Sequence, residues 1–255
     1  MVFADVKIPS DSVCSFLNKN EIAPIMVKAD KANILEHIIS GFAHDVNNPM
    51  SLIMLSADIL FENSASQGNG ADHQVRHLAS SINESADKIN KLVSLLKCFN
   101  KPDDHGNILD LNEYVKKALA LTDYNLKSSV DQVESHFAEQ HLYLKGSGYD
   151  LYHLVTSVIL NTSLALEQKN GLFRVVTEDK EGKFRLSVQN QIIGSEEECG
   201  LQEKKEVFFE DSSWWTAQYL AHSLNAQISF RLAEGMQAIT DLYFNPFSLS
   251  DSKKH

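Results

Sequence analysis

The sequence predicts an α+β protein, in which an N-terminal helical hairpin forms a dimeric four-helix bundle and an α/β sandwich follows. Two long apolar stripes at helical spacing, separated by a polar loop, predict the hairpin. The segment Lys101–Asn107 combines proline, glycine and charge, which is typical of a domain linker. Beyond it, helical patterns mix with short alternating strands, as expected of one sheet covered on one face by helices.

The two stripes define the hairpin. The first lies within a helix expected from about Asp30 to Phe61 and comprises Leu35, Ile38, Phe42, Val46, Met50, Ile53, Ala57 and Leu60. The second comprises Val75, Leu78, Ile82, Ser85, Ile89, Leu92, Leu96 and Phe99. Its steps alternate between three and four residues, the spacing of core positions in helical bundles. One hairpin supplies only half of a four-helix core, so we expect a homodimer.

These patterns divide the chain into five segments. They are an N-terminal extension (1–29), the dimerisation hairpin (30–100) with its polar loop at 62–72, the linker (101–107), the second domain (108–248) and a tail (249–255). A short helix capped by Ser10 or Asp11 is expected over 13–17. The extension is too short for a sensor domain, so a signal would arrive through another protein.

The second domain is expected to alternate helices and strands. Helices are predicted over 111–126, 147–168 and 213–225, and strands near 132–137, 142–144, 172–177, 183–189, 227–232 and 237–244. The strands at 172–177 and 183–189 are separated by a short turn and should form a hairpin. A charged loop at 196–206 precedes the last helix.

Charge and cysteine content exclude several classes of protein. Lys and Arg number 23 against 34 Asp and Glu, which gives a net charge of −11. Such a chain is a poor candidate for binding nucleic acid or an anionic membrane through its overall field. Three scattered cysteines, Cys14, Cys98 and Cys199, argue against a disulfide framework or a zinc ribbon. Without a membrane-length apolar run or a secretory signal pattern, the sequence predicts a cytoplasmic protein that makes no membrane contact.

Chemical groups cluster on one turn of the first helix, in the sequence GFAHDVNNPM. His44 is offset by two residues from Phe42, about 200° around the helix, so its imidazole should point away from the core. Asp45 is adjacent, and Asn48 lies one turn further on the same face. Pro49 removes a helix hydrogen bond at a cost of about 3 kcal/mol, so we expect a bend there. The alternative is a solvated histidine beside an incidental kink.

GFAHDVNNP resembles the phosphoacceptor box of sensor histidine kinases, whose phosphotransfer domain is a helical hairpin that dimerises into a four-helix bundle. The resemblance covers about residues 30–100. It implies that His44 takes and gives the phosphoryl group, a reaction that suits imidazole near neutral pH. It also implies that Asp45 orients the ring and accepts its proton, and that Asn48 positions water to dephosphorylate a partner.

The order of elements in 108–245 is similar to that of the same family's ATP-binding domain. By that resemblance Asn161 falls at the metal-ligand position of the nucleotide site, and Ser157 stands where a second asparagine is usual. The family's Asp-x-Gly-x-Gly turn corresponds to 190–194, where Asn190 replaces the aspartate, Ile192 replaces the first glycine, and only Gly194 remains. The glycine box before the last helix corresponds to VFFEDSSWW, which has no glycine.

Glycine is scarce in the whole chain, with 11 of 255 residues. Side chains therefore occupy positions where a triphosphate would need bare backbone, and Asp211 adds negative charge. We expect no ATP binding, and we interpret Asn161 as a vestige of a cofactor-binding position. Trp214 and Trp215 are expected to pack in the core or at a domain interface. A pair of histidines at i, i+4, His73 and His77, lacks a third ligand, so we expect no metal site.

The sequence thus favours a histidine phosphotransfer protein of a two-component phosphorelay, which passes a phosphoryl group between response-regulator aspartates through His44 without ATP. Its partner would be a receiver domain that brings its own Mg²⁺ and aspartate, and a sensor kinase is a further candidate partner. Two alternatives stay open. One is a divergent histidine kinase/phosphatase that autophosphorylates His44 from ATP. The other is a non-catalytic regulator that binds a kinase or a receiver.

Overall fold

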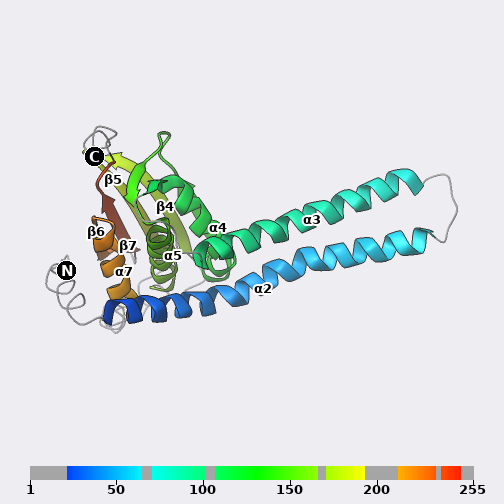
Figure 1. Ribbon diagram of the computed structural model, residues 1–255, viewed down its shortest axis with the longest axis horizontal. Coiled ribbons are helices and arrows are strands. Elements are labelled where there is room, and N and C mark those ends of the chain that lie inside the picture. Colours follow the sequence, from blue (N-terminus) through cyan, green and yellow to red (C-terminus); the bar gives the residue numbers. More distant parts are fainter. Residues whose placement is uncertain are drawn as a thin grey trace.

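The computed structural model describes residues 22–64, 71–100, 107–165, 171–192, 212–233 and 237–247. Helix α2 spans Ile22–Ser64 and helix α3 spans Ala71–Asn100, and the two pack against each other as a hairpin. Figure 1 shows this hairpin projecting far beyond the second domain. The predicted hairpin is confirmed. Among the described helices, none is both long enough and apolar enough to cross a membrane.

The second domain follows the predicted order of helices and strands, except that an unpredicted strand, which begins at the last residue of the predicted linker, precedes the first helix. Its helices are α4 (Leu111–Ser129), α5 (Gly148–Leu164) and α7 (Ser212–Ser223); its strands are β1 (Asn107–Asp110), β2 (Gln132–His136), β3 (Tyr143–Gly146), β4 (Gly171–Lys180), β5 (Lys183–Ile192), β6 (Ala226–Ala233) and β7 (Gln237–Phe244). Asp110 and Ser147 begin α4 and α5, because each side chain accepts a hydrogen bond from a backbone N–H of the first turn. Helix α5 ends at Leu164, not near Gln168 as predicted.

The strands form two sheets where the sequence predicted one. Five strands lie in the order β2-β4-β5-β7-β6, with β2 and β4 parallel and the other pairs antiparallel. Strand β3 instead pairs with β1 in a separate antiparallel ribbon. The reason lies in the helix caps: β1 leads directly into α4, and β3 leads into α5. Since α4 and α5 pack together, the short strands that precede these two helices also lie side by side.

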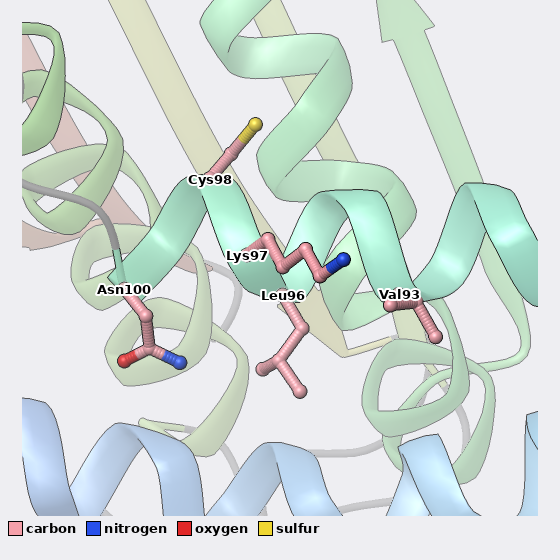
Figure 2. Close-up of a pocket in the computed structure, with 5 residues that line it drawn as sticks. All are labelled: Val93, Leu96, Lys97, Cys98 and Asn100. Carbon is pink, nitrogen blue, oxygen red and sulfur yellow. The ribbon is translucent and has the colours of Figure 1, made fainter.

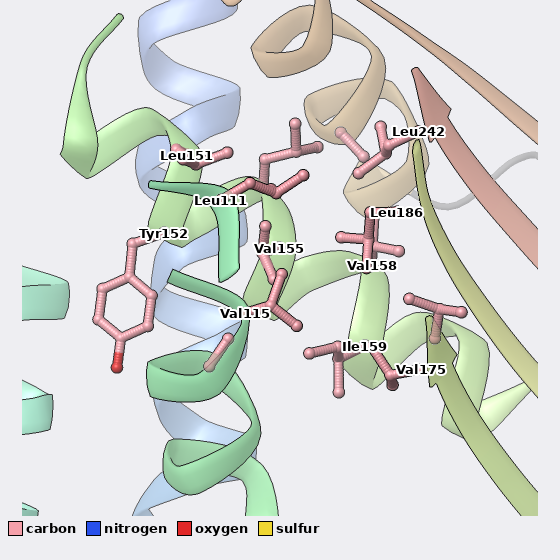
Figure 3. Close-up of a cluster of buried hydrophobic side chains, with 14 of the residues drawn as sticks. Leu111, Val115, Leu151, Tyr152, Val155, Val158, Ile159, Val175, Leu186 and Leu242 are labelled. Atoms are coloured by element: carbon pink, nitrogen blue, oxygen red, sulfur yellow. The ribbon is translucent and has the colours of Figure 1, made fainter. Parts of the chain in front are cut away.

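Helices cover one face of the main sheet (Figure 1), as predicted. Side chains alternate along β5 and β7, so that Leu186 and Leu242 face Val155 and Val158 of α5 in the main core (Figure 3). The opposite face carries polar groups. There the guanidinium of Arg185 lies 2.7 Å from a carboxylate oxygen of Glu178 and 2.8 Å from one of Asp241.

The main core continues from the second domain into the hairpin. Ile34 and Ile38 of α2 and Phe99 of α3 belong to the same buried cluster as Leu111 and Val155, and none of the three is more than 4% exposed. Helix α2 contacts α4, α5 and α7 along this stretch. The first half of α2 is thus an additional layer on the helices of the sandwich.

This packing explains why α2 starts at Ile22, eight residues before the predicted start at Asp30. The predicted stripe follows contacts with α3, whereas the first turns of α2 pack on the second domain, with Ala23 and Asp30 buried and Ile25 exposed. Part of the segment interpreted as an N-terminal extension is therefore helical. The short helix predicted over 13–17 and the charged loop at 196–206 lie outside the described residues.

A buried hydrogen bond joins the two domains. Nε2 of His153 on α5 lies 2.8 Å from Oδ2 of Asp30 on α2, and both side chains are fully buried. Nearby, the Tyr152 hydroxyl lies 3.4 Å from the carbonyl oxygen of Leu95 on α3 and 3.3 Å from that of Lys117 on α4. Burial raises the pKa of Tyr152, which keeps the phenol protonated as a donor to these carbonyls. The junction is therefore specified by polar groups as well as by apolar packing.

We predict that Asp30→Leu destabilises the protein by about 1–3 kcal/mol, because the buried imidazole of His153 would lose its hydrogen-bond partner. Urea denaturation followed by circular dichroism measures the loss. Asp58→Leu, at an exposed site on the same helix, is the control and should change stability by less than about 0.5 kcal/mol. The double substitution Asp30→Leu/His153→Leu should recover much of the loss. An Asp30→Leu variant as stable as the parent would contradict this account of the junction.

Candidate functional site

His44 lies on α2 close to the point where the hairpin meets the second domain. Its side chain is 52% exposed, which agrees with its predicted offset from the apolar stripe. Buried Ile38 and Pro49, six residues before it and five after it, mark the packed side of the same helix. One part of the imidazole is therefore covered by protein and the other part is open to a reactant.

Asp45 contacts the imidazole directly. Its Oδ1 lies 3.3 Å from Nδ1 of His44. An ionised carboxylate can only accept a hydrogen bond, so this contact favours the tautomer that carries its proton on Nδ1. The lone pair of Nε2 is then available as the nucleophile of the ring.

Asn48 and Pro49 lie one turn further along α2. Asn48 is exposed on the side of His44, and Pro49 is buried. Helix α2 continues through Pro49, and the missing N–H leaves the carbonyl of Asp45 without its helical donor. Nearby, the Ser51 hydroxyl donates to the carbonyl of Asn47 at 2.9 Å. The bend expected at this proline stays a prediction.

Tyr124 of α4 is a neighbour of His44 that the sequence did not reveal. The two ring centroids lie 4.7 Å apart with the planes tilted by 42°. Gly41, one turn before His44, makes room for this contact: a Cβ built there would lie 2.5 Å from Cδ1 of Tyr124. A glycine inside a strongly periodic helix was the available signal. Glycine there lowers helix stability by roughly 0.5–1 kcal/mol relative to alanine, so its presence indicates that another group packs closely against the backbone.

Lys127 brings a positive charge to the same region. Its Nζ lies 2.6 Å from Oδ2 of Asp123, and the hydrogen bond and charge of Asp123 raise the pKa of Lys127, with a smaller contribution from Asp45. Lys127 thus stays charged, and its field reaches the carboxylate that contacts His44. Tyr124 and Lys127 both come from the last turns of α4.

Asn161 lies on a different element. It is on α5, where its side-chain nitrogen donates to the Ser157 hydroxyl at 3.2 Å. Asn190, at the position that resembles the family's aspartate, is 1% exposed, and its Nδ2 donates to the carbonyls of Thr162 and Ser163 at 3.2 and 3.0 Å. An aspartate has no donor for these carbonyls, so the amide is required by this packing.

Trp214 packs in an apolar cluster at the start of α7. It is 4% exposed and lies with Ile192, Phe230 and Ala238, and its ring centroid is 5.9 Å from that of Phe230. The prediction that this indole belongs to a core is confirmed, whereas Trp215 is only partly buried. Gly194 and most of the VFFEDSSWW box lie outside the described residues.

Within the part of the chain that the structure describes, no group of three or more His, Cys, Asp or Glu side chains could hold a metal ion. His73 and His77 are exposed on α3.

Comparisons with known proteins show what the hairpin is similar to. Residues 34–104 match the family model described as the His Kinase A (phospho-acceptor) domain. The sensor histidine kinase ZraS of Escherichia coli (strain K12) is 26% identical over 164 residues, which cover 64% of this chain and 34% of the kinase. ZraS of Klebsiella oxytoca is 23% identical over 172 residues, covering 67% and 36% respectively. The chain spans about a third of the length of the curated relatives it matches.

Solved structures show a loose likeness. The catalytic domain of histidine kinase ThkA matches with a TM-score of 0.44 and 15% identity, over 56% of this chain and 100% of that one. A bacterial phosphotransferase matches with a TM-score of 0.40 and 14% identity, over 83% of this chain and 96% of that one.

The hairpin is therefore similar to the phospho-acceptor domain of histidine kinases, and the GFAHDVNNP segment lies within the matched residues. The distant relatives are sensor histidine kinases of the same family.

We predict that Asn190→Asp destabilises the second domain by about 3 kcal/mol, because a buried carboxylate would face two carbonyl oxygens that now accept from the amide. Thermal unfolding followed by circular dichroism measures the loss. Asn90→Asp, at an exposed position of α3, is the matched control and should have little effect. Equal melting temperatures for Asn190→Asp and the parent would show that this amide is not needed for packing.

Proposed function

We propose that the chain is a histidine phosphotransfer protein of a two-component phosphorelay, which passes a phosphoryl group between response-regulator aspartates through His44 without binding ATP. The observation that carries the proposal is a half-exposed imidazole held at Nδ1 by Asp45, on a hairpin of the phospho-acceptor family. Domains of this family dimerise and pass phosphate to response regulators, so the proposed partner is a receiver domain.

The proposed transfer needs little from this chain beyond an oriented imidazole. Nε2 of His44 attacks the phosphorus of the receiver's aspartyl phosphate. The N–P bond forms as the bond from phosphorus to the carboxylate oxygen breaks, and the receiver's carboxylate leaves with the electron pair. Asp45 balances the positive charge on the ring by accepting a hydrogen bond from Nδ1. The reverse steps load a second receiver, and each receiver supplies its own Mg²⁺ and aspartate.

A docking surface for the receiver continues from His44 along α2. Leu55 lies eleven residues after His44, which returns it to within about 20° of the same face, and it is 57% exposed. Ser51 lies on this stripe between them and is also exposed. Leu52, next to the stripe, is 51% exposed. Exposed leucines beside a reactive histidine favour a protein partner at this face.

Another apolar side of the hairpin supports the proposed homodimer. Ile39 and Met50, eleven residues apart on one side of α2, are 56% and 45% exposed, although Met50 belongs to the predicted core stripe. At the end of α3 lies an open, mostly apolar hollow of about 450 Å³, where Leu96 points toward α2 (Figure 2). A second hairpin would bury apolar surface that one chain leaves in solvent.

Core packing at the positions that resemble nucleotide boxes supports a relay without ATP. Asn190 donates to α5, and Ile192 packs with Trp214. The rival proposal is a divergent histidine kinase/phosphatase, which is favoured by Asn161 at the resembling metal-ligand position and by the sensor kinases among the relatives. The remaining alternative is a regulator that binds a kinase or receiver without phosphorylation.

We predict that His44→Gln abolishes phosphoryl transfer. Receiver domains phosphorylated with labelled acetyl phosphate are mixed with the dimer, and acid-labile label on this chain is measured over time. His37→Gln, at an exposed position two turns earlier on α2, is the control and should accept label at the parent's rate.

Three outcomes separate the candidates in this experiment. Label on His44→Gln equal to that on the parent contradicts the relay. Label taken from ATP by the parent and lost in His44→Gln supports the kinase. A receiver that binds the parent but leaves no phosphohistidine supports the regulator.

We predict that two substitutions to glutamate on α2 have different effects. Met50→Glu should convert the dimer to a monomer in light scattering, because a charge would enter the bundle core. Leu55→Glu should stay dimeric and raise the KM for the phosphorylated receiver by about tenfold, as expected for loss of a central apolar contact. A monomeric Leu55→Glu protein, or a dimeric Met50→Glu protein, would contradict this assignment of the two faces.

A further inference from the structure

We propose that Tyr124 is a positioning residue for His44: its ring fixes the plane of the imidazole so that Nε2 faces the incoming phosphoryl donor. The proposal rests on the proposed phosphotransfer function and deepens it. It gives the second domain a part in the reaction that needs no nucleotide, because Tyr124 belongs to α4 while His44 belongs to the hairpin.

The contact between the two rings is direct. Their centroids lie 4.7 Å apart at an interplanar angle of 42°, which is within the range of favourable aromatic pairs. The side chain of His44 is still 52% exposed. Tyr124 therefore covers one part of the imidazole and leaves the rest accessible.

The surrounding backbone is built for this contact. Gly41 is buried, and a Cβ there would lie 2.5 Å from Cδ1 and 2.9 Å from Cβ and Cγ of Tyr124. The next residue of α4, Asn125, donates from Nδ2 to the carbonyl oxygen of His37 at 2.8 Å. This carbonyl lies one turn before Gly41 on α2. The tyrosine thus rests on bare helix backbone, and a hydrogen bond beside it holds α4 to α2.

Two contacts together define the orientation of the ring. Asp45 holds Nδ1 at 3.3 Å within α2, and Tyr124 limits rotation of the ring from outside that helix. An exposed histidine with only the first contact would sample other rotamers. Holding the nucleophile in a reactive orientation lowers the barrier, because less motion has to be frozen in the transition state.

The docked second domain keeps Tyr124 in place. Ile34 and Ile38, in the turns of α2 that precede Gly41, are buried in the main core that this domain supplies. The Asp30–His153 pair closes the same interface at 2.8 Å. Tyr124 therefore approaches His44 from a fixed frame, not from a mobile loop.

Two substitutions test the contact from opposite sides. Tyr124→Leu removes the ring, and Gly41→Ala places a methyl group where the ring lies while favouring the helix. Tyr124→Phe keeps the ring and serves as the rescuing variant. Tyr143→Leu is the matched control, because Tyr143 on β3 stacks on another histidine, His141, with ring centroids 5.4 Å apart.

The first measurement is the NMR signal of the His44 ring protons, which feel the ring current of Tyr124. The second is the rate at which phosphoramidate phosphorylates His44; here the donor's P–N bond breaks, ammonia leaves, and the Nε2–P bond forms. The third is transfer from a phosphorylated receiver, with kcat and KM separated. The phosphoramidate reaction needs no receiver, so it tests the positioning role independently of the proposed relay.

Tyr124→Leu and Gly41→Ala should shift the His44 ring signals and slow both reactions by about tenfold, with the KM for the receiver unchanged. Tyr124→Phe and Tyr143→Leu should behave as the parent. Parent-like phosphoramidate rates in Tyr124→Leu overturn the proposal, as does a change confined to KM. The relay is overturned, and the positioning role retained, if the phosphoramidate reaction of His44 depends on Tyr124 but the parent never accepts phosphate from a receiver.

Discussion

The packing of the first half of α2 on the second domain is the constraint on which the rest of the structure depends. Ile34 and Ile38 are buried in the same core as the helices of the sandwich, and Asp30 pairs with His153 within that interface. A buried pair of this kind adds specificity, because a shifted register would leave both groups unpaired in the interior. The hairpin and the sandwich are therefore held in one relative arrangement.

This arrangement decides the environment of His44. Before it, one side of α2 packs on the second domain; after it, α2 pairs with α3 and leaves the side of Leu55 and Asn48 in solvent. His44 lies at the change from one environment to the other. It can therefore receive Tyr124 from the docked domain and still be reached by another protein. A histidine placed further along the hairpin would have the exposure without the aromatic neighbour.

The periodicity of the sequence predicted those helices and strands that are determined by residues close together in the chain. The stripes of α2 and α3 and the alternation of β4 and β5 were recognised because each element buries one face. The start of α2, the pairing of β3 with β1 and the Tyr124 contact depend on packing between distant segments, which one sequence does not reveal. Gly41 was the local sign of that packing, but a glycine indicates only that some group approaches the backbone closely and does not identify that group.

Several positions of the second domain that the sequence compared with nucleotide boxes serve packing in the structure. Asn190 uses both amide hydrogens on carbonyls of α5, and Trp214 closes an apolar cluster with Ile192. Asn161 lies on α5, whereas the ring beside His44 comes from α4. The interface that buries Ile34 and Ile38 is also the one that brings Tyr124 to His44. In the proposed relay, the second domain thus contributes to the reaction through this interface, which places Tyr124 beside His44.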